Sequence, residues 1–295
     1  MLLFLAMWVG WAKSPADSLK YNYGRLVELD HATLSLADSE RLQRLADAYD
    51  AMFAPAFKSS NLVAVPPADL EILSQASQRL AYYTNDERYL RDMIKVMDVF
   101  GSSAAPDALR RFHQTLLQFR RFDDAKLLAR EHPELDFESV PEVVKAESNI
   151  RPNAYTIDQG SEQLREIQVP LRGETLVVVV HPRCHFSVGA MDALRQHPFL
   201  RSIKLIWLAP VGLHLDYEEI KVWNAAHADQ SIVLARRVKD WPMLGRWETP
   251  SFYLLQDGNV IADFSGWPKE GNWPQLKALL AKRSEKRIEV ESLEQ

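Results

Sequence analysis

The chain has 295 residues, enough for about two domains and for a core that needs no covalent staples. Its 47% hydrophobic and 25% charged residues are ordinary for globular proteins, which excludes wholesale disorder, collagen and coiled-coil classes. The formal net charge of −5 gives no broad basic surface for nucleic acid. A single cysteine, Cys184, excludes an intramolecular disulfide and a cysteine-rich zinc site.

Residues 1–12 form an uncharged apolar run that is too short to cross a bilayer. The run is typical of the hydrophobic region of a secretory signal peptide, with the small residues Gly10 and Ala12 before a cleavage site at Lys13. No lysine or arginine precedes the run, so a buried first helix is the alternative. A cleaved signal predicts export from the cytoplasm without a stable membrane span.

Apolar residues at helical spacing predict an all-α domain over residues 13–150. Five helices are expected in chain order: residues 42–52 after a start signal at Ser35 and Asp38, a helix opened by Pro66 and Pro67, residues 90–100 ending at Gly101, a helix from Pro106, and a shorter helix from Asp123 to before Pro133. Short connections between such helices favour antiparallel neighbours.

The last two of these helices partially resemble a tetratricopeptide hairpin. The matching residues are Phe122, Ala125, Ala129 and Pro133. No period of about 34 residues recurs, so an irregular helical bundle is the preferred interpretation. Either arrangement commonly presents a surface to a protein partner.

The periodicity changes from 3.6 to 2 after the polar segment 148–153, which predicts an α/β domain over residues 151–283. The expected elements are a β-hairpin over 155–171 with a turn at 158–161, a buried strand at 176–180, a helix at 186–196, a strand at 203–208, a helix at 216–226, strands at 232–234, 251–255 and 260–264, and a helix at 276–280. This order predicts a mixed central sheet. Residues 284–295 are expected to be a charged tail.

Two segments of this domain resemble the thioredoxin superfamily. They are LVVVVHPRCHFSVGAMDAL and WETPSFYLLQDGNVIADFSGW, with Cys184-His185-Phe186-Ser187 in place of Cys-x-x-Cys. The resemblance covers roughly residues 154–283 and includes the N-terminal hairpin of secreted bacterial thioredoxin-like proteins. It implies an α/β thioredoxin-like domain, which the periodicity predicts to be preceded by an all-α helical domain. The signal-like segment 1–12 predicts a periplasmic location.

Cys184 is the candidate nucleophile because it lies where a buried strand meets a helix. Unpaired N–H groups at a helix N-terminus favour a thiolate, and Arg183 and His185 can add positive potential. Such settings lower a cysteine pKa from ~8.5 to values between ~3.5 and 7.5. The alternative is a buried structural cysteine.

Ser187 changes the chemistry, since serine cannot attack a mixed disulfide as a second cysteine would. A mixed disulfide on Cys184 must then be resolved by a protein thiol or a small thiol. The Ser187 hydroxyl can donate a hydrogen bond to the thiolate, although it can also be an ordinary helix-start residue. The resemblance implies that Thr249 and a cis Pro250 bind the substrate backbone beside Cys184, whereas the dipeptide alone also permits a trans proline.

The function that these residues predict is thiol-disulfide exchange in the bacterial cell envelope, with no cofactor. The competing hypothesis is a non-catalytic adaptor with a degenerate thioredoxin fold. Three departures favour the adaptor: Arg183 replaces the usual tryptophan, strand 176–180 carries no acid, and the second cysteine is missing. Six tryptophans lie between Trp207 and Trp273, and Trp241 and Trp247 are candidates to line a partner cleft.

Two further alternatives also use Cys184. A peroxiredoxin-like peroxidase would have threonine or serine where His181 stands. A copper carrier could use His181, Cys184 and His185, with His214 as a further ligand, but the usual second cysteine is missing. Neither is preferred, and no metal is expected.

Overall fold

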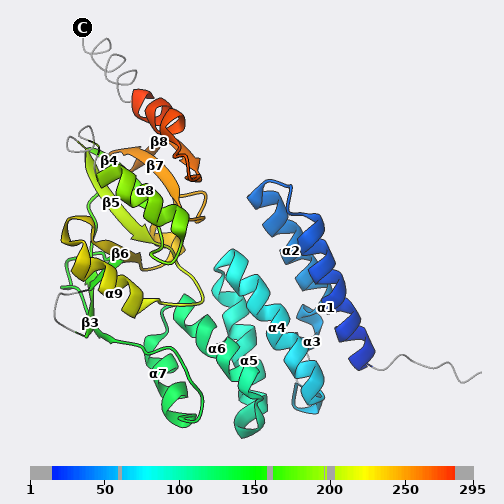
Figure 1. Cartoon of the computed structure of the whole chain (residues 1–295). Coiled ribbons are helices and arrows are strands. Elements are labelled where there is room, and N and C mark those ends of the chain that lie inside the picture. Colours follow the sequence, from blue (N-terminus) through cyan, green and yellow to red (C-terminus); the bar gives the residue numbers. More distant parts are fainter. Residues whose placement is uncertain (1–14, 59–61, 158–161, 196, 198–202, 283–295) are drawn as a thin grey trace, which may run out of the picture. The chain divides into compact units, whose positions relative to one another are not determined.

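The computed structural model describes residues 15–58, 62–157, 162–195, 197 and 203–282. The fold divides into two compact units, residues up to 119 with 123–137, and residues 120–122 with 138 onward (Figure 1). The sheet of the second unit begins before the expected boundary at residue 150, because β1 (Glu142–Val144) already belongs to it. The expected signal peptide and charged tail lie outside the described residues.

The first half of the chain is helical, as the apolar spacing predicts. The helices are α1 (Pro15–Ala32), α2 (Asp38–Met52), α3 (Ala54–Lys58), α4 (Pro67–Thr84), α5 (Glu87–Phe100), α6 (Pro106–Gln118) and α7 (Phe122–Glu131). The expected start signal at Ser35 and Asp38 is wrong, because Ala37 is the N-cap of α2 and makes no side-chain cap. Helix α1 was not predicted, since its stripe is diluted by polar residues and only Leu26 is fully buried among its apolar side chains.

Helix α4 is the centre of the first unit and packs against α1, α2, α5 and α6. Pro67 can open this helix because a proline in the first turn leaves no hydrogen bond unmade. Its buried face, with Leu73 and Leu80, joins Leu45 and Tyr49 of α2 in one apolar core. Helix α4 thus joins the helices that precede it in the chain to those that follow it.

A buried carboxylate links three helices of this bundle. Asp30 of α1 is 2% exposed and pairs with Arg41 of α2 and Arg79 of α4. The Tyr83 hydroxyl also donates to it at 2.9 Å. Burial raises the pKa of Asp30, but the hydrogen bonds from Tyr83, Arg41 and Arg79 outweigh burial and hold that pKa below its usual value.

Asp30→Asn is expected to lower the free energy of unfolding by about 3 kcal/mol, because two partly buried guanidinium groups lose their buried anion. The folded-state pKa of Asp30 is lowered, so its stabilisation is present above the unfolded pKa and is lost as the pH falls through the folded pKa. Urea denaturation at neutral and acidic pH measures both effects. The exposed Asp47→Asn is the control, with an expected change below about 0.5 kcal/mol. Equal losses in both variants would contradict the prediction.

The second unit is built on one mixed sheet with the strand order β1-β3-β2-β6-β5-β4-β7-β8. Its other strands are β2 (Ala154–Ile157), β3 (Gln163–Ile167), β4 (Glu174–Val179), β5 (Lys204–Ala209), β6 (Ile232–Ala235), β7 (Ser251–Gln256) and β8 (Asn259–Ser265). Strands β2 and β3 form the expected antiparallel hairpin. Strands β4, β5 and β6 run parallel, and β7 and β8 are antiparallel to their neighbours.

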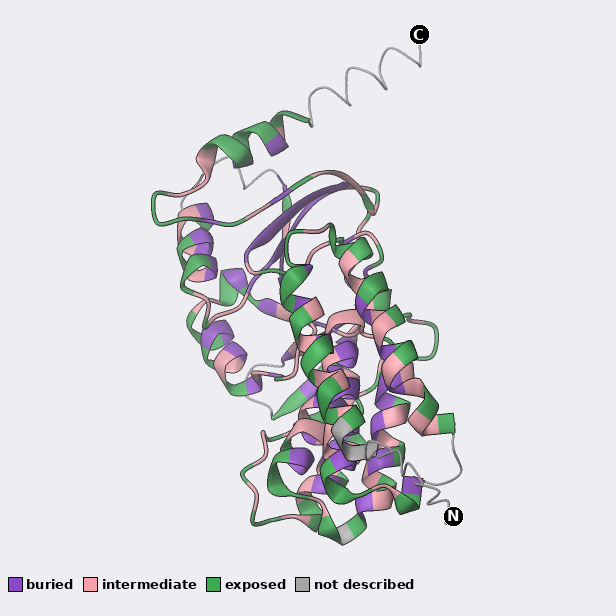
Figure 2. Ribbon diagram, turned by 90° about the vertical axis from the view of Figure 1, so that its right-hand side faces the viewer, coloured by how far each residue is buried: buried purple, intermediate pink, exposed green. Residues whose placement is uncertain are grey.

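The run 176–180 was predicted to be buried on both faces, and each of its residues is 0% exposed. Alternate residues of a strand face opposite sides of a sheet. On one side Val177 and Val179 pack with Trp241 and Tyr253. Helices α8 (His185–Arg195) and α9 (Tyr217–Ala226) connect β4 to β5 and β5 to β6, and right-handed connections place both helices on one face (Figure 1). Figure 2 shows that the buried colour is continuous along the central strands.

The sheet topology brings three distant loops to one edge. The loop after β4 contains Cys184, and the loop after β5 leads to Asp216 at the start of α9. Strand β7 is antiparallel to β4 with Val179 opposite Ser251, so Thr249 and Pro250 arrive at this same edge. None of the helices in the described ranges has both the length and the apolar character of a transmembrane span.

Candidate functional site

Cys184 lies directly before α8, as the sequence predicts. Its N–H donates to the His181 carbonyl oxygen at 3.0 Å, which closes the turn after β4. Its own carbonyl oxygen accepts the N–H of Val188 at 3.0 Å, which is the first helical hydrogen bond. The side chain is half-buried. The sulfur is thus held at a helix N-terminus and is not enclosed in the core.

The sulfur contacts the segment that precedes β7. Cys184 Sγ donates to the carbonyl oxygen of Thr249 at 3.3 Å. The Thr249–Pro250 peptide bond is cis, the conformation that the thioredoxin resemblance implies. The structure therefore brings Cys184 to the Thr249–Pro250 segment, from which it is 65 positions away in the sequence.

Hydrogen bonds decide the pKa of the Cys184 thiol. Burial raises this pKa, but the N–H and hydroxyl of Ser187, the Thr249 side chain and the N–H of Phe186 together lower it below its ordinary value. Two of these donors are backbone N–H groups at the start of α8, where the first N–H groups of a helix are unpaired. The thiolate is the reactive form, so its fraction at neutral pH is larger than for an ordinary cysteine.

Ser187 is placed to support this thiolate. Its side chain is fully buried, and its Oγ accepts the backbone N–H of His181 at 3.3 Å. Its hydroxyl proton remains available as a donor. A hydrogen bond from this hydroxyl is one of the interactions that lower the pKa of Cys184.

Arg183 pairs with carboxylates and does not supply the positive potential expected of it. Its guanidinium pairs with Asp216 and lies 3.6 Å from Glu219, both at the start of α9. The expected positive potential of Arg183 is thus largely neutralised by two carboxylates. His185, the other flanking residue, stacks on Phe186 with ring centroids 3.8 Å apart.

Asp216, at the start of α9, contacts the turn that precedes Cys184. His181 Nε2 lies 2.8 Å from Asp216 Oδ2, and the backbone N–H of Arg183 donates to His181 Nδ1 at 3.2 Å. A nitrogen that accepts cannot carry a proton, so the imidazole is neutral with its proton on Nε2. Burial and the charge of Arg183 lower the pKa of His181, which agrees with this tautomer.

Glu138 also holds Asp216 in place, through hydrogen bonds to the backbone before α9. Its Oε1 accepts the N–H groups of Leu215 at 2.9 Å and of Asp216 at 2.7 Å, and its Oε2 lies 3.2 Å from His214 Nδ1. Burial raises the pKa of Glu138, partly opposed by His214 and by the Leu215 N–H. Neither Asp216 nor Glu138 was predicted as a site residue, because each is far from Cys184 in the sequence and belongs to no motif there.

The histidines of the copper hypothesis are engaged in these networks. His181 is bonded to Asp216, and His214 is bonded to Glu138. Within the described ranges, no three His, Cys, Asp or Glu side chains gather as potential metal ligands.

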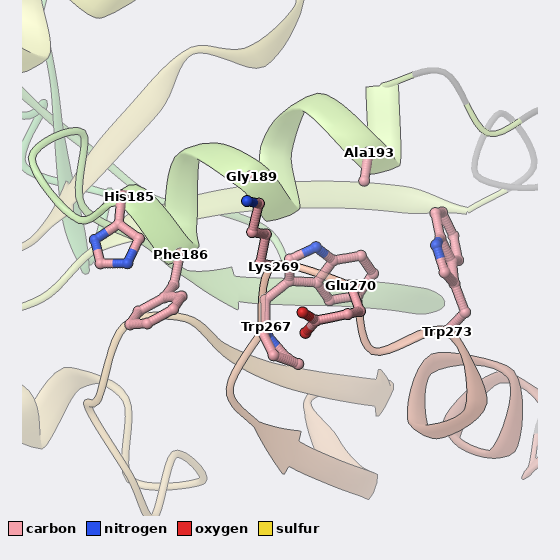
Figure 3. Close-up of a pocket in the computed structure, with 10 residues that line it drawn as sticks. His185, Phe186, Gly189, Ala193, Trp267, Lys269, Glu270 and Trp273 are labelled. Carbon is pink, nitrogen blue, oxygen red and sulfur yellow. The ribbon is translucent and has the colours of Figure 1, made fainter.

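A groove lies next to the reactive turn, along one side of α8 (Figure 3). Its volume is about 380 Å³. The walls are His185, Phe186, Gly189 and Ala193 of α8 and residues 267–271 and 273. Trp241, expected to line a partner cleft, is instead fully buried and donates its Nε1–H to the Asn153 carbonyl at 2.8 Å. The tryptophans at the groove are Trp267 and Trp273.

No protein-family model matches the chain, and no curated protein matches it. One solved structure is similar, a thioredoxin-like protein from Bacteroides caccae that is 14% identical over 95% of this chain and 97% of that chain. The TM-score is 0.28, which is too low to establish a shared fold. The site is therefore interpreted from the geometry of this chain.

Ser187→Ala is expected to raise the pKa of Cys184, because the hydroxyl donor is lost while the backbone donors remain. The alkylation rate with iodoacetamide at pH 7 should fall several-fold, and the midpoint of the rate against pH should move upward. Ser231→Ala, which removes an exposed hydroxyl far along the sequence, is the control. An unchanged midpoint would show that the hydroxyl does not support the thiolate.

Asp216→Asn is expected to have the opposite effect. The substitution removes one of the two anions beside Arg183, so positive potential near Cys184 increases and the pKa of the thiol falls further. Asparagine tolerates the left-handed conformation of Asp216, whose φ is 51°, so the turn should persist. Glu218→Gln, which removes a charge from the same helical turn, is the control. A midpoint that rises in Asp216→Asn would contradict this account.

Proposed function

We propose that residues 138–282 form a thioredoxin-like domain whose function is thiol-disulfide exchange through Cys184. The observation that carries this proposal is the contact between Cys184 Sγ and the carbonyl of the cis Thr249–Pro250 segment. A half-buried sulfur with a lowered pKa at a helix N-terminus is suited to nucleophilic attack. A purely structural cysteine would need none of these features.

The chemistry is a single exchange on one sulfur. The Cys184 thiolate attacks one sulfur of a disulfide, a new S–S bond forms, and the other sulfur leaves as a thiolate. There is no net oxidation, because one disulfide replaces another. Ser187 cannot attack the mixed disulfide, so a protein thiol or small thiol must release Cys184 by the same reaction in reverse. The reactions open to this site are disulfide isomerisation and thiol-dependent reduction.

Thr249 and Pro250 are proposed to bind the substrate backbone. They lie at the edge of the sheet where the sulfur is half-exposed, so a chain joined to Cys184 must pass beside them. Arg183, His181 and Asp216 are proposed as positioning residues of the turn, since their contacts are with one another.

The proposed location is the periplasm, where disulfides persist and a lone reactive thiol has substrates. The support is the apolar segment 1–12 of the sequence. The partners in this setting are protein thiols and disulfides or a small thiol. The helical unit is proposed to bind a protein partner, as helical domains commonly do.

Reaction with glutathione disulfide tests the function. The purified chain is expected to form a mixed disulfide at Cys184 faster than free cysteine does at pH 7, because a larger fraction of its thiol is ionised. Mass spectrometry gives the rate and the site, and Cys184→Ser is the matched control that should gain no adduct.

A rate no faster than that of free cysteine, with both glutathione disulfide and a scrambled protein substrate, would contradict the exchange function. The adaptor hypothesis would then be preferred. In that case Cys184→Ala would leave the biological role intact, and changes on the surface of the helical unit would abolish it.

A further inference from the structure

The groove beside α8 begins where the reactive turn ends. His185 and Phe186 follow Cys184 in the sequence and form its near end, and Gly189 and Ala193 continue it along the helix. A volume of about 380 Å³ is within the range of pockets that take small ligands or side chains. A molecule joined to Cys184 therefore has this groove within its immediate reach.

The far wall of the groove is tied to the same segment that holds the sulfur. The N–H of Gly266 donates to the carbonyl oxygen of Pro250 at 2.9 Å. The next residue, Trp267, is 4% exposed and packs on Phe252 of β7 with ring centroids 5.6 Å apart. The wall of the groove that contains Trp267 is thus joined, through Gly266 and Phe252, to the segment that the sulfur of Cys184 contacts.

The walls of the groove are aromatic, and its floor is kept open by small residues. Trp267 and Trp273 meet edge to face, with centroids 5.3 Å apart and planes at 75°. Phe186 at the near end is 42% exposed, which is unusual for a phenylalanine. A ring bound in the groove can contact the exposed Phe186 in the same way, since aromatic pairs favour edge-to-face and offset-stacked contacts. Gly189 and Ala193 leave the space that such a ring would fill.

The charges at the groove favour an uncharged occupant. Lys269 and Glu270 both line it, and Figure 3 shows both side chains beside Trp267. A cation in the groove would meet Lys269 and an anion would meet Glu270, so a charged group gains little from either residue. A neutral aromatic ring gains the stacking contacts without this penalty.

We propose that this groove binds an aromatic side chain of a polypeptide whose own cysteine, a few residues away, forms the disulfide that Cys184 attacks. The inference rests on the proposed exchange function and names its substrate class. The thiolate attacks the polypeptide disulfide, the polypeptide sulfur joins Cys184, and the other sulfur leaves with the electron pair. The aromatic side chain holds the polypeptide in place during that step.

The test uses short peptides whose cysteine carries thionitrobenzoate as a coloured leaving group. One set has tryptophan two residues before or after the cysteine, and the matched set has alanine there. The better tryptophan peptide is expected to react about fivefold to tenfold faster than its alanine counterpart, since ring contacts contribute about 1 to 1.4 kcal/mol. The mixed disulfide of glutathione with thionitrobenzoate is the small-thiol probe, and it is expected to react at the rate of the alanine peptides.

Gly189→Leu fills the groove and identifies where the preference arises. A Cβ at Gly189 would lie 3.8 Å from Trp267 Cδ1, an ordinary contact, and the rest of the leucine side chain would occupy the groove that Gly189 lines. Leucine also favours a helix more than glycine does. The ratio of the tryptophan-peptide rate to the alanine-peptide rate is expected to fall toward one. Arg195→Leu, at the exposed end of α8 outside the groove, should keep the ratio of the unchanged protein.

Each result has a distinct meaning. Equal rates for tryptophan and alanine peptides, a ratio that Gly189→Leu leaves intact, or a glutathione probe as fast as the tryptophan peptide would overturn the aromatic subsite. All three of these results leave exchange through Cys184 standing. Only a failure to react with every disulfide would remove the proposed function together with this inference.

Discussion

The candidate site of the second unit depends on the hydrogen bonds that neighbouring groups donate to one half-buried sulfur. Cys184 lies where β4 ends and α8 begins, and burial there penalises its ionised form. The N–H groups of Phe186 and Ser187 and the Ser187 hydroxyl reverse that penalty. These donors are available only because a helix leaves its first N–H groups unpaired. A reactive thiol at this place is therefore a consequence of the strand-to-helix turn, provided that the turn is held in one conformation.

The charged residues around the turn hold that conformation rather than activate the thiol. Glu138 accepts a hydrogen bond from the backbone at the start of α9. Asp216 pairs with His181 and Arg183, which lie in the turn before Cys184. The arrangement neutralises Arg183, so the thiolate is stabilised mainly by hydrogen bonds from neighbouring donors. Such bonds are less sensitive to ionic strength than the field of an unpaired cation.

A site with one sulfur must take its selectivity from the surface around it. With serine at position 187, the second step of any exchange belongs to another molecule. The time that a substrate spends on Cys184 then depends on what holds it there. The cis Thr249–Pro250 segment and the aromatic groove are both positioned for that role, and the hydrogen bond between Gly266 and Pro250 joins them. The segments proposed to bind the substrate are thus connected to the segment that contacts the sulfur of Cys184.

The sequence by itself determined the order of elements, the buried central strand and the position of Cys184 at a helix start, because periodicity and local turn chemistry are properties of neighbouring residues. Through a resemblance carried by two short motifs, it also predicted roles for Ser187 and Thr249. It missed α1, whose stripe is diluted by polar residues, and β1, a strand of three residues. Only the tertiary structure paired Arg183 with Asp216, placed Glu138 behind Asp216, and buried Trp241 while leaving Trp273 at a groove. These contacts join residues far apart in the chain, and the strand order of the sheet, which no local pattern encodes, decides which of them meet.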